Sequence, residues 1–256
     1  MIYISTNMYR PESFEKVYRI TDALDFPIGI EIFPFFNDEN YEKLLQDNFE
    51  RLKNYEITFH EPYNKTDHSY LEGEVYDRTL DYFNKMLKFK DLNPKYIVYH
   101  YNNRKVDDKE KMLEAARKNL DFFGDLTLTP LLIENVGVDD RGNKLLDEDE
   151  FIEECLTRNE KVLIDIGHAN ANGWDMENLI SSLKEKIVSY HLHTNDGRCD
   201  EHRSIFEDGK TPDINKIISL IKKYTPEADL VIEYLNYYED KEDLVTYDIK
   251  KLKELL

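Results

Sequence analysis

The chain is 256 residues long, which fits one large domain such as an α/β barrel, or two small ones. Hydrophobic residues make up 41 % of it, enough for a full core, and no apolar stretch approaches the roughly 18 residues needed to cross a bilayer. The formal net charge is −19, from 53 acidic and 34 basic residues. Because such a surface repels polyanions on average, nucleic acids and anionic membranes are disfavoured as partners, although a local basic groove could overcome this average.

Neither the N-terminal residues nor the cysteines indicate secretion. Residues 1–5 enter a strand-like run without the basic segment, apolar stretch and small-residue cleavage site of a signal peptide. Cys155 falls in a helical pattern and Cys199 in a loop, so the two cysteines do not form a disulfide framework. We therefore expect a cytoplasmic protein.

Short apolar runs alternate with longer amphipathic segments along the chain. The predicted strands are residues 2–5, 28–33, 56–59, 95–100, 130–134, 161–166, 188–192 and 230–234. The predicted helices are residues 13–24, 40–53, 75–89, 109–123, 148–156, 176–186, 214–224 and 241–255, in several of which apolar residues recur at spacings of three and four. Strands that alternate with helices, without a flexible linker or low-complexity segment, predict a single (β/α)8 TIM barrel over residues 1–256.

The stretch 190–202 is rich in side chains that bind metals. It contains His191, His193, Asp196, Asp200 and His202. Imidazole and carboxylate groups together suit zinc, manganese or iron better than calcium, because nitrogen ligands favour borderline metals. Histidine pairs also occur on solvated loops, so this stretch by itself indicates a metal site without establishing one.

Similar residues end other predicted strands, where a barrel of this kind builds its active site. Taken singly, each histidine could be a hydrogen-bonded core residue, and each glutamate could pair with an arginine. Taken together, they predict a shared cation, because buried carboxylates cost free energy unless they are paired or bound to a metal. The residues at these strand ends are His60, His100, Glu134, Asp165, His168, His191 and Glu233.

Two further expectations concern single residues. Asp165 and His168 can both face the barrel mouth only if the chain turns between them, which Gly167 permits. His68 lies apart from the other histidines on a polar loop, where we expect it to be solvated.

These motifs resemble the xylose isomerase-like TIM-barrel superfamily over nearly the whole chain. The most specific parts are Asp165-x-x-His168, His191-x-His193 and a glutamate at the end of the last strand, Glu233. The superfamily includes sugar isomerases, epimerases and apurinic-site endonucleases. Resemblance to the epimerases implies one divalent ion (Zn, Mn, Mg or Co) and no organic cofactor. The implied metal ligands are Glu134, Asp165, His191 and Glu233.

Resemblance to the endonuclease branch implies a larger centre, because that branch binds three zinc ions through nine ligands. His60-x-Pro62-Tyr63 is similar to that branch, but Glu134 is followed by Asn-Val-Gly-Val instead of the small glycine-rich run of the branch. The nine matching positions are His60, His100, Glu134, Asp165, His168, His191, Asp200, His202 and Glu233.

The leading hypothesis is a metal-dependent isomerase or epimerase that acts on a sugar, sugar phosphate or related polyol ketone through a metal-stabilised enediolate. Glu134 and Glu233 would transfer the proton, for which a pKa raised toward neutrality would be suitable, and the resemblance places His168 on the substrate. The alternative is a zinc-dependent phosphodiesterase of the endonuclease type. The sequence leaves open which sugar and metal bind and whether the chain forms a homo-oligomer.

Five further residues are candidates for contacts with a small carbohydrate substrate. Aromatic rings could cover the apolar face of a sugar, and arginines could hold a phosphate or hydroxyl groups. Ordinary loop packing and solvated charge are the competing explanations for each of them. The candidates are Tyr63, Tyr101, Trp174, Arg198 and Arg203.

Overall fold

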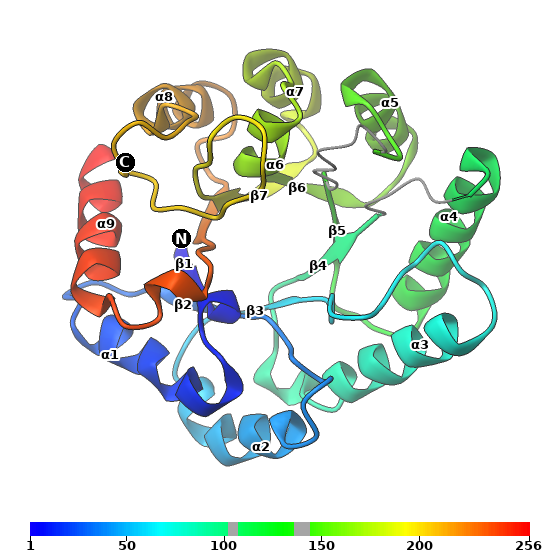
Figure 1. The fold of residues 1–256 in the computed structure, drawn as a ribbon, viewed down its shortest axis with the longest axis horizontal. Coiled ribbons are helices and arrows are strands. Elements are labelled where there is room, and N and C mark those ends of the chain that lie inside the picture. The colour runs from blue at the N-terminus through cyan, green and yellow to red at the C-terminus, as the bar shows by residue number, and fades with distance from the viewer. Residues whose placement is uncertain (102–106, 136–143) are drawn as a thin grey trace.

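The protein is a closed barrel of parallel strands surrounded by helices, as seen in a computed structural model that describes residues 1–101, 107–135 and 144–256 (Figure 1). Each strand pairs with its neighbours in chain order, and β8 closes the barrel on β1. The prediction of a single (β/α)8 barrel is therefore confirmed. The strands are β1 (Ile2–Ser5), β2 (Gly29–Ile32), β3 (Ile57–His60), β4 (Ile97–His100), β5 (Leu131–Glu134), β6 (Lys161–Asp165), β7 (Ile187–Leu192) and β8 (Asp229–Ile232).

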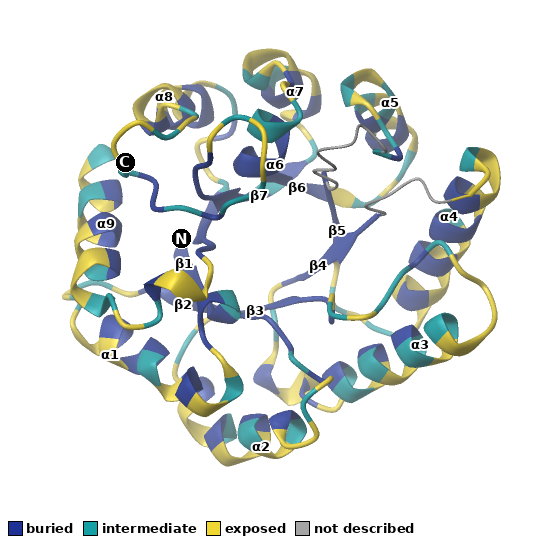
Figure 2. Cartoon of the chain, viewed as in Figure 1, coloured by how far each residue is buried: buried dark blue, intermediate teal, exposed yellow. Residues whose placement is uncertain are grey.

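The helices form the outer ring. They turn a buried stripe toward the barrel and an exposed stripe outward, as the spacing of apolar residues predicts (Figure 2). None of the helices in the described part of the chain is long and apolar enough to span a membrane. The α-helices are α1 (Val17–Asp22), α2 (Tyr41–Leu52), α3 (Glu74–Leu87), α4 (Lys109–Asp125), α5 (Glu148–Thr157), α6 (Ile166–Ala171), α7 (Met176–Leu183), α8 (Ile214–Tyr224) and α9 (Glu242–Leu255).

The structure differs from the prediction at the first helix, and it contains one helix, α6, that was not predicted. The segment predicted as a helix from residue 13 begins as a 3-10 helix, η2 (Pro11–Lys16), and continues as α1. The short helix α6 starts directly after β6, where the carboxylate of Asp165 accepts a hydrogen bond from the backbone N–H of His168 at 2.7 Å. A strand and a helix that follow without a loop leave no turn signal in the sequence. Three more 3-10 helices are present: η1 (Thr6–Met8) after β1, η3 (Lys90–Leu92) before β4 and η4 (Asn236–Tyr238) after β8.

Strand register brings polar residues of neighbouring strands side by side. His100 pairs with Glu134 across β4 and β5, and Asp165 pairs with His191 across β6 and β7. These residues lie at or near the carboxyl ends of their strands, and the residues two positions earlier on β4, β5 and β6, which are Val98, Leu132 and Leu163, form a buried cluster with Tyr96. Because all strands run in the same direction, their polar ends form one face of the barrel.

Candidate metal centre

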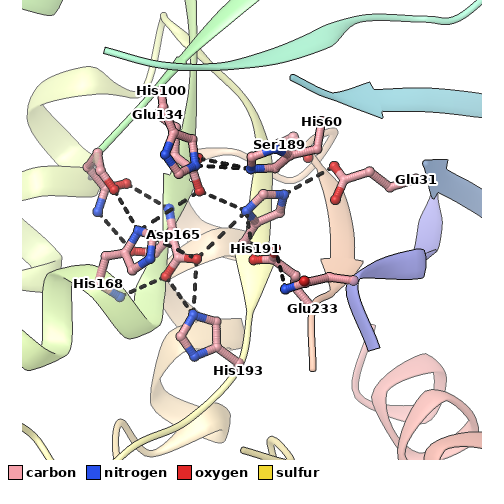
Figure 3. Close-up of polar contacts among 12 residues, drawn as sticks. Glu31, His60, His100, Glu134, Asp165, His168, Ser189, His191, His193 and Glu233 are labelled. Atoms are coloured by element: carbon pink, nitrogen blue, oxygen red, sulfur yellow. Dashed lines mark hydrogen bonds and ion pairs between the residues drawn. The ribbon is translucent and has the colours of Figure 1, made fainter. Parts of the chain in front are cut away.

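Buried histidines and carboxylates converge at the carboxyl end of the barrel (Figure 3). They form three groups, and within each group one possible ligand atom from every residue lies within 4.8 Å of the others. The groups contain all nine positions that match the ligands of the endonuclease branch, together with His193, whereas Asp196 belongs to none of them. They are Glu134, Asp165, His191 and Glu233; His60, His100 and Glu134; and His168, His193, Asp200 and His202.

The first group gathers three carboxylates around one imidazole nitrogen. His191 Nδ1 lies 2.8 Å from Glu134 Oε1, 3.2 Å from Glu233 Oε2 and 3.7 Å from Asp165 Oδ2. All four residues are buried, and a single N–H proton cannot compensate three carboxylates in a low-dielectric interior. A divalent cation fits this donor set, because it would offset the negative charge and accept nitrogen and oxygen ligands together.

Two residues that the sequence did not predict also contact this group. Glu31 on β2 is fully buried, and its Oε2 lies 3.1 Å from His191 Nε2, on the side of the ring away from Glu134. Asn7 in η1 donates a hydrogen bond to Glu233 Oε1 at 3.2 Å. A charged residue inside the predicted apolar strand 28–33 was the available signal for Glu31.

The second group pairs two histidines on Glu134. Nε2 of His100 lies 2.6 Å and Nε2 of His60 lies 3.7 Å from Glu134 Oε2, and the two nitrogens are 3.0 Å apart. Glu61, the next residue after His60, accepts a hydrogen bond from the backbone N–H of His100 at 2.8 Å. Its other oxygen pairs with His68, so His68 is buried and not solvated as expected from its polar loop.

The third group repeats this arrangement around Asp200. Asp200 Oδ2 lies 3.1 Å from His168 Nε2 and 3.0 Å from His202 Nε2. His193 stacks on His202 with ring centroids 3.9 Å apart, and its Nε2 lies 2.9 Å from Asp165 Oδ1. The third group is therefore joined to the first through Asp165.

Main-chain carbonyl groups fix which ring nitrogen faces the centre in three of these histidines. Nδ1 of His60, His168 and His202 lies 2.7, 2.9 and 3.0 Å from the carbonyl oxygens of Glu61, Asn135 and Glu233. A carbonyl only accepts, so each Nδ1 must donate its proton there. Each neutral ring then keeps Nε2 free as a metal ligand, an orientation common among metal-binding histidines.

In the metal-free protein the pKa of Glu134 is lowered, whereas the pKa of His202 is raised. Burial alone would raise the pKa of Glu134, but His100 and His191 outweigh it and hold that pKa well below its ordinary value. Burial would lower the pKa of His202, but Asp200 and Glu233 raise it to about 10. The expected pKa near neutrality is therefore not found for Glu134, because its neighbours are histidines whose positive charge stabilises the carboxylate.

A cavity of ≈ 500 Å³ opens above the centre. Its lining includes His60, His100, His168, Asp200 and His202 from the second and third groups. From the first group only Glu233 lines it, whereas the other three residues are buried beneath. The cavity is large enough for a small molecule, and its walls carry the aromatic rings of Tyr9, Phe33, Phe35 and Tyr63.

The three aromatic residues proposed as substrate contacts take different places. Tyr63 lines the cavity, with its ring centroid 4.6 Å from that of His100. Tyr101 is buried outside it and donates a hydrogen bond to Glu154 on α5 at 2.5 Å. Trp174 also lies outside it and packs on an aromatic ring of α5 at 5.7 Å. Two of the three rings are thus directed toward the surrounding helices.

Neither of the two arginines proposed as substrate contacts lines the cavity. Arg203 pairs with Glu207 at 2.9 Å, and its guanidinium lies 4.5 Å from the ring centroid of Tyr237. Arg198 is exposed on the loop after β7. A different arginine, Arg10 in the loop after β1, lies at the cavity instead.

The fold and the site define a class of protein. The chain matches the xylose isomerase-like TIM barrel family over residues 20–255 and belongs to that family. An uncharacterized protein of Methanocaldococcus jannaschii is 27 % identical, in an alignment that covers 77 % of this chain and 84 % of that protein.

Solved structures share the fold at low sequence identity. A D-tagatose 3-epimerase-like protein superposes with a TM-score of 0.75 at 18 % identity, covering 99 % of this chain and 98 % of the other. The IolI protein with a bound zinc atom superposes with a TM-score of 0.73 at 16 % identity, covering 98 % and 95 %. At these identities the likeness concerns the fold.

Proposed function

We propose that the chain is a metal-dependent isomerase or epimerase of a small carbohydrate. The observation that carries the proposal is the first group: Glu134 Oε1 and Glu233 Oε2 lie 2.8 and 3.2 Å from the same nitrogen of His191, and Glu233 also lines the cavity. The likeness to an epimerase-like protein and to a zinc-containing structure of the same fold supports it.

In this proposal Glu134 and Glu233 have different roles. A bound divalent ion would supply Lewis acidity toward the carbonyl and the neighbouring hydroxyl of the substrate. Glu233 lines the cavity and is placed to take the proton from the carbon between them, giving an enediolate on the substrate. Glu134 lies below the lining, so its main role is to hold the ion. His168 lines the cavity and would bind a substrate hydroxyl.

Proton exchange with solvent tests the chemistry. With a ketose in deuterated water, the protein should introduce deuterium at the carbon beside the carbonyl. Glu233→Gln should slow this exchange by about 100-fold or more, because the carboxylate base is lost, whereas the amide oxygen of glutamine can still meet the metal. Glu134→Gln should lose metal and exchange together. Epimerisation without solvent exchange, together with full activity in both variants, would exclude the enediolate route.

A specific observation also favours a second function. The second and third groups offer further donors, and Glu134 belongs to two groups, which is typical of multinuclear centres that cleave phosphoesters. Against a nucleic-acid substrate stands the scarcity of cations, since Arg10 is the one arginine or lysine among the described residues of the cavity lining.

Metal counting separates the two functions. One ion per chain in protein purified without chelators agrees with the epimerase. Three zinc ions together with cleavage of abasic duplex DNA would establish the phosphodiesterase. Three ions without affinity for DNA at low salt would instead indicate a small phosphorylated substrate.

A further inference from the structure

The charge of the cavity lining is unusual for so acidic a chain. The chain has 19 more acidic than basic residues, and the lining includes Asp200 and Glu233. Arg10 brings a permanent positive charge to this lining, and it is the only described lysine or arginine there. It is exposed, whereas His168, His202 and Glu233 are buried, so Arg10 lies on the open side of the cavity.

The guanidinium of Arg10 also lacks the partner that most other arginines have. In the part of the chain that the structure describes, no carboxylate pairs with it. Arg10 differs from an isolated surface arginine because it lines the cavity that holds the candidate centre. Six other described arginines do form ion pairs with carboxylates: Arg19, Arg51, Arg78, Arg117, Arg158 and Arg203.

The backbone beneath Arg10 is held in place. Its carbonyl oxygen accepts hydrogen bonds from the backbone N–H of Ser13 at 2.9 Å and from the Ser13 hydroxyl at 3.1 Å. Pro11 follows and favours the extended conformation that Arg10 has, with φ −70° and ψ 160°. Tyr9 on one side and Phe14 beyond it are buried. Only the side chain of Arg10 then loses freedom when it binds a ligand, which lowers the cost of binding.

We infer that Arg10 binds an anionic group, a phosphate or a carboxylate, on the part of the substrate that is distant from the reacting carbons. The planar guanidinium suits both anions because it can donate two parallel hydrogen bonds to either. Asn64 and Asn236 also line the cavity, and a side-chain amide can donate a hydrogen bond to the same anion. The inference rests on the proposed function and narrows its substrate class to acidic or phosphorylated sugars.

Three ligands that differ only at one carbon test the inference: D-fructose, D-fructose 6-phosphate and D-fructuronate. Their dissociation constants are measured by calorimetry on the zinc-loaded protein, Arg10→Met and Arg10→Lys. Arg10→Met should weaken binding of the phosphate or the carboxylate by about 10- to 100-fold, as expected for a lost charge-assisted hydrogen bond, and should leave fructose unchanged. Arg10→Lys should recover part of the loss, and the loss should shrink at high salt.

Arg198→Met is the matched control, because Arg198 is an exposed arginine outside the cavity. Equal binding of both anionic ligands by the wild type and Arg10→Met, or an equal loss in Arg198→Met, would overturn the inference. If the wild type binds none of the three sugars, the proposed function loses its support for these ketohexoses, independently of Arg10. Inorganic phosphate then decides about Arg10: weaker binding by Arg10→Met supports the subsite, and equal binding rejects it.

Discussion

Main-chain carbonyl oxygens fix the proton position in three histidines of this centre. Because the main chain receives the Nδ1 protons of His60, His168 and His202, these rings present Nε2 without a rearrangement. His191 is different, since its Nε2 faces the carboxylate of Glu31 and its Nδ1 faces the centre. Glu31 therefore decides which nitrogen of His191 carries the proton.

Glu31→Gln should test this role. Glutamine keeps the volume and an acceptor oxygen but loses the charge that holds the proton on Nε2. We expect metal affinity to fall by about 10- to 100-fold, as for other partners of metal-binding histidines. Competition with a chromophoric chelator measures it. Glu56→Gln, at the opposite end of the barrel, serves as the control, and equal affinity in wild type and Glu31→Gln would show that Glu31 does not act on His191.

Gly167 is needed because the ring of His193 packs closely against its backbone, and not because the chain turns there. Its φ is not positive, but an added Cβ would lie 1.9 Å from His193 Cε1 and 2.5 Å from Nε2. The ring of His193 fills the place that any side chain would take, between Asp165 and His202.

Gly167→Ala should therefore displace His193 and disturb the third group. We expect a lower free energy of unfolding, by about 1–3 kcal/mol as for an overpacked core, together with weaker metal binding. Gly124→Ala is the control, because nothing lies within 4 Å of its Cβ and alanine favours the helix. The midpoint of urea unfolding should fall for Gly167→Ala, and it should rise or stay unchanged for Gly124→Ala. Equal stability of both variants would contradict the close approach.

At the scale of elements, the last helix holds the loop that carries Asp200 and His202. Asp248 on α9 accepts hydrogen bonds from the Ser204 hydroxyl at 2.6 Å and from the Tyr234 hydroxyl at 2.9 Å. The Tyr234 hydroxyl accepts in turn from the backbone N–H of Ile205 at 2.9 Å. A helix at the end of the chain is thus linked to two loops of the site.

Asp248→Ala should loosen this link. Two buried hydroxyl groups lose their acceptor, at a cost of about 1–3 kcal/mol each, so the free energy of unfolding should fall clearly. Asp243→Ala on the same helix lacks these contacts and should change stability little. Urea unfolding compares the two, and metal content reports whether the loop of His202 has moved. Equal unfolding midpoints would rule out the link.

At the scale of the whole molecule, the centre couples stability to pH. The raised pKa of His168, His191 and His202 stabilises the metal-free fold fully below the unfolded value of about 6.5, and this contribution is lost as pH rises toward the folded value, about 10 for His202. The lowered pKa of Glu134, Asp165 and Asp200 stabilises the fold above about pH 4 and fails only in stronger acid.

The metal-free protein should therefore be most stable between about pH 4.5 and 6.5 and lose thermal stability from pH 6.5 toward 10. The zinc-loaded protein should lose less over this range, because metal replaces protons on the histidines and binds more tightly as pH rises. Melting temperatures of chelator-treated and zinc-loaded protein measure both curves. A melting temperature of the metal-free protein that rises from pH 6.5 to 9 would contradict the assignment.

The sequence by itself determined the elements of the barrel and most of the centre. Hydrophobic periodicity reports local structure, and parallel strands that close into a barrel must bring their carboxyl ends to one face. The pattern of strands alone therefore predicts that residues such as His60 and Glu233, which end distant strands, lie together. The helix α6 was not predicted from the sequence, because no turn separates it from β6.

The tertiary structure decided which way each side chain points. Tyr101 and Tyr63 look alike in sequence, yet one donates to α5 and the other lines the cavity. His68 lies in a polar loop but is buried because Glu61, seven residues earlier, turns toward it. Contacts of this kind join residues whose distance in space has no counterpart in local periodicity. For the same reason only the fold showed Arg10 at the cavity and Glu31 behind His191.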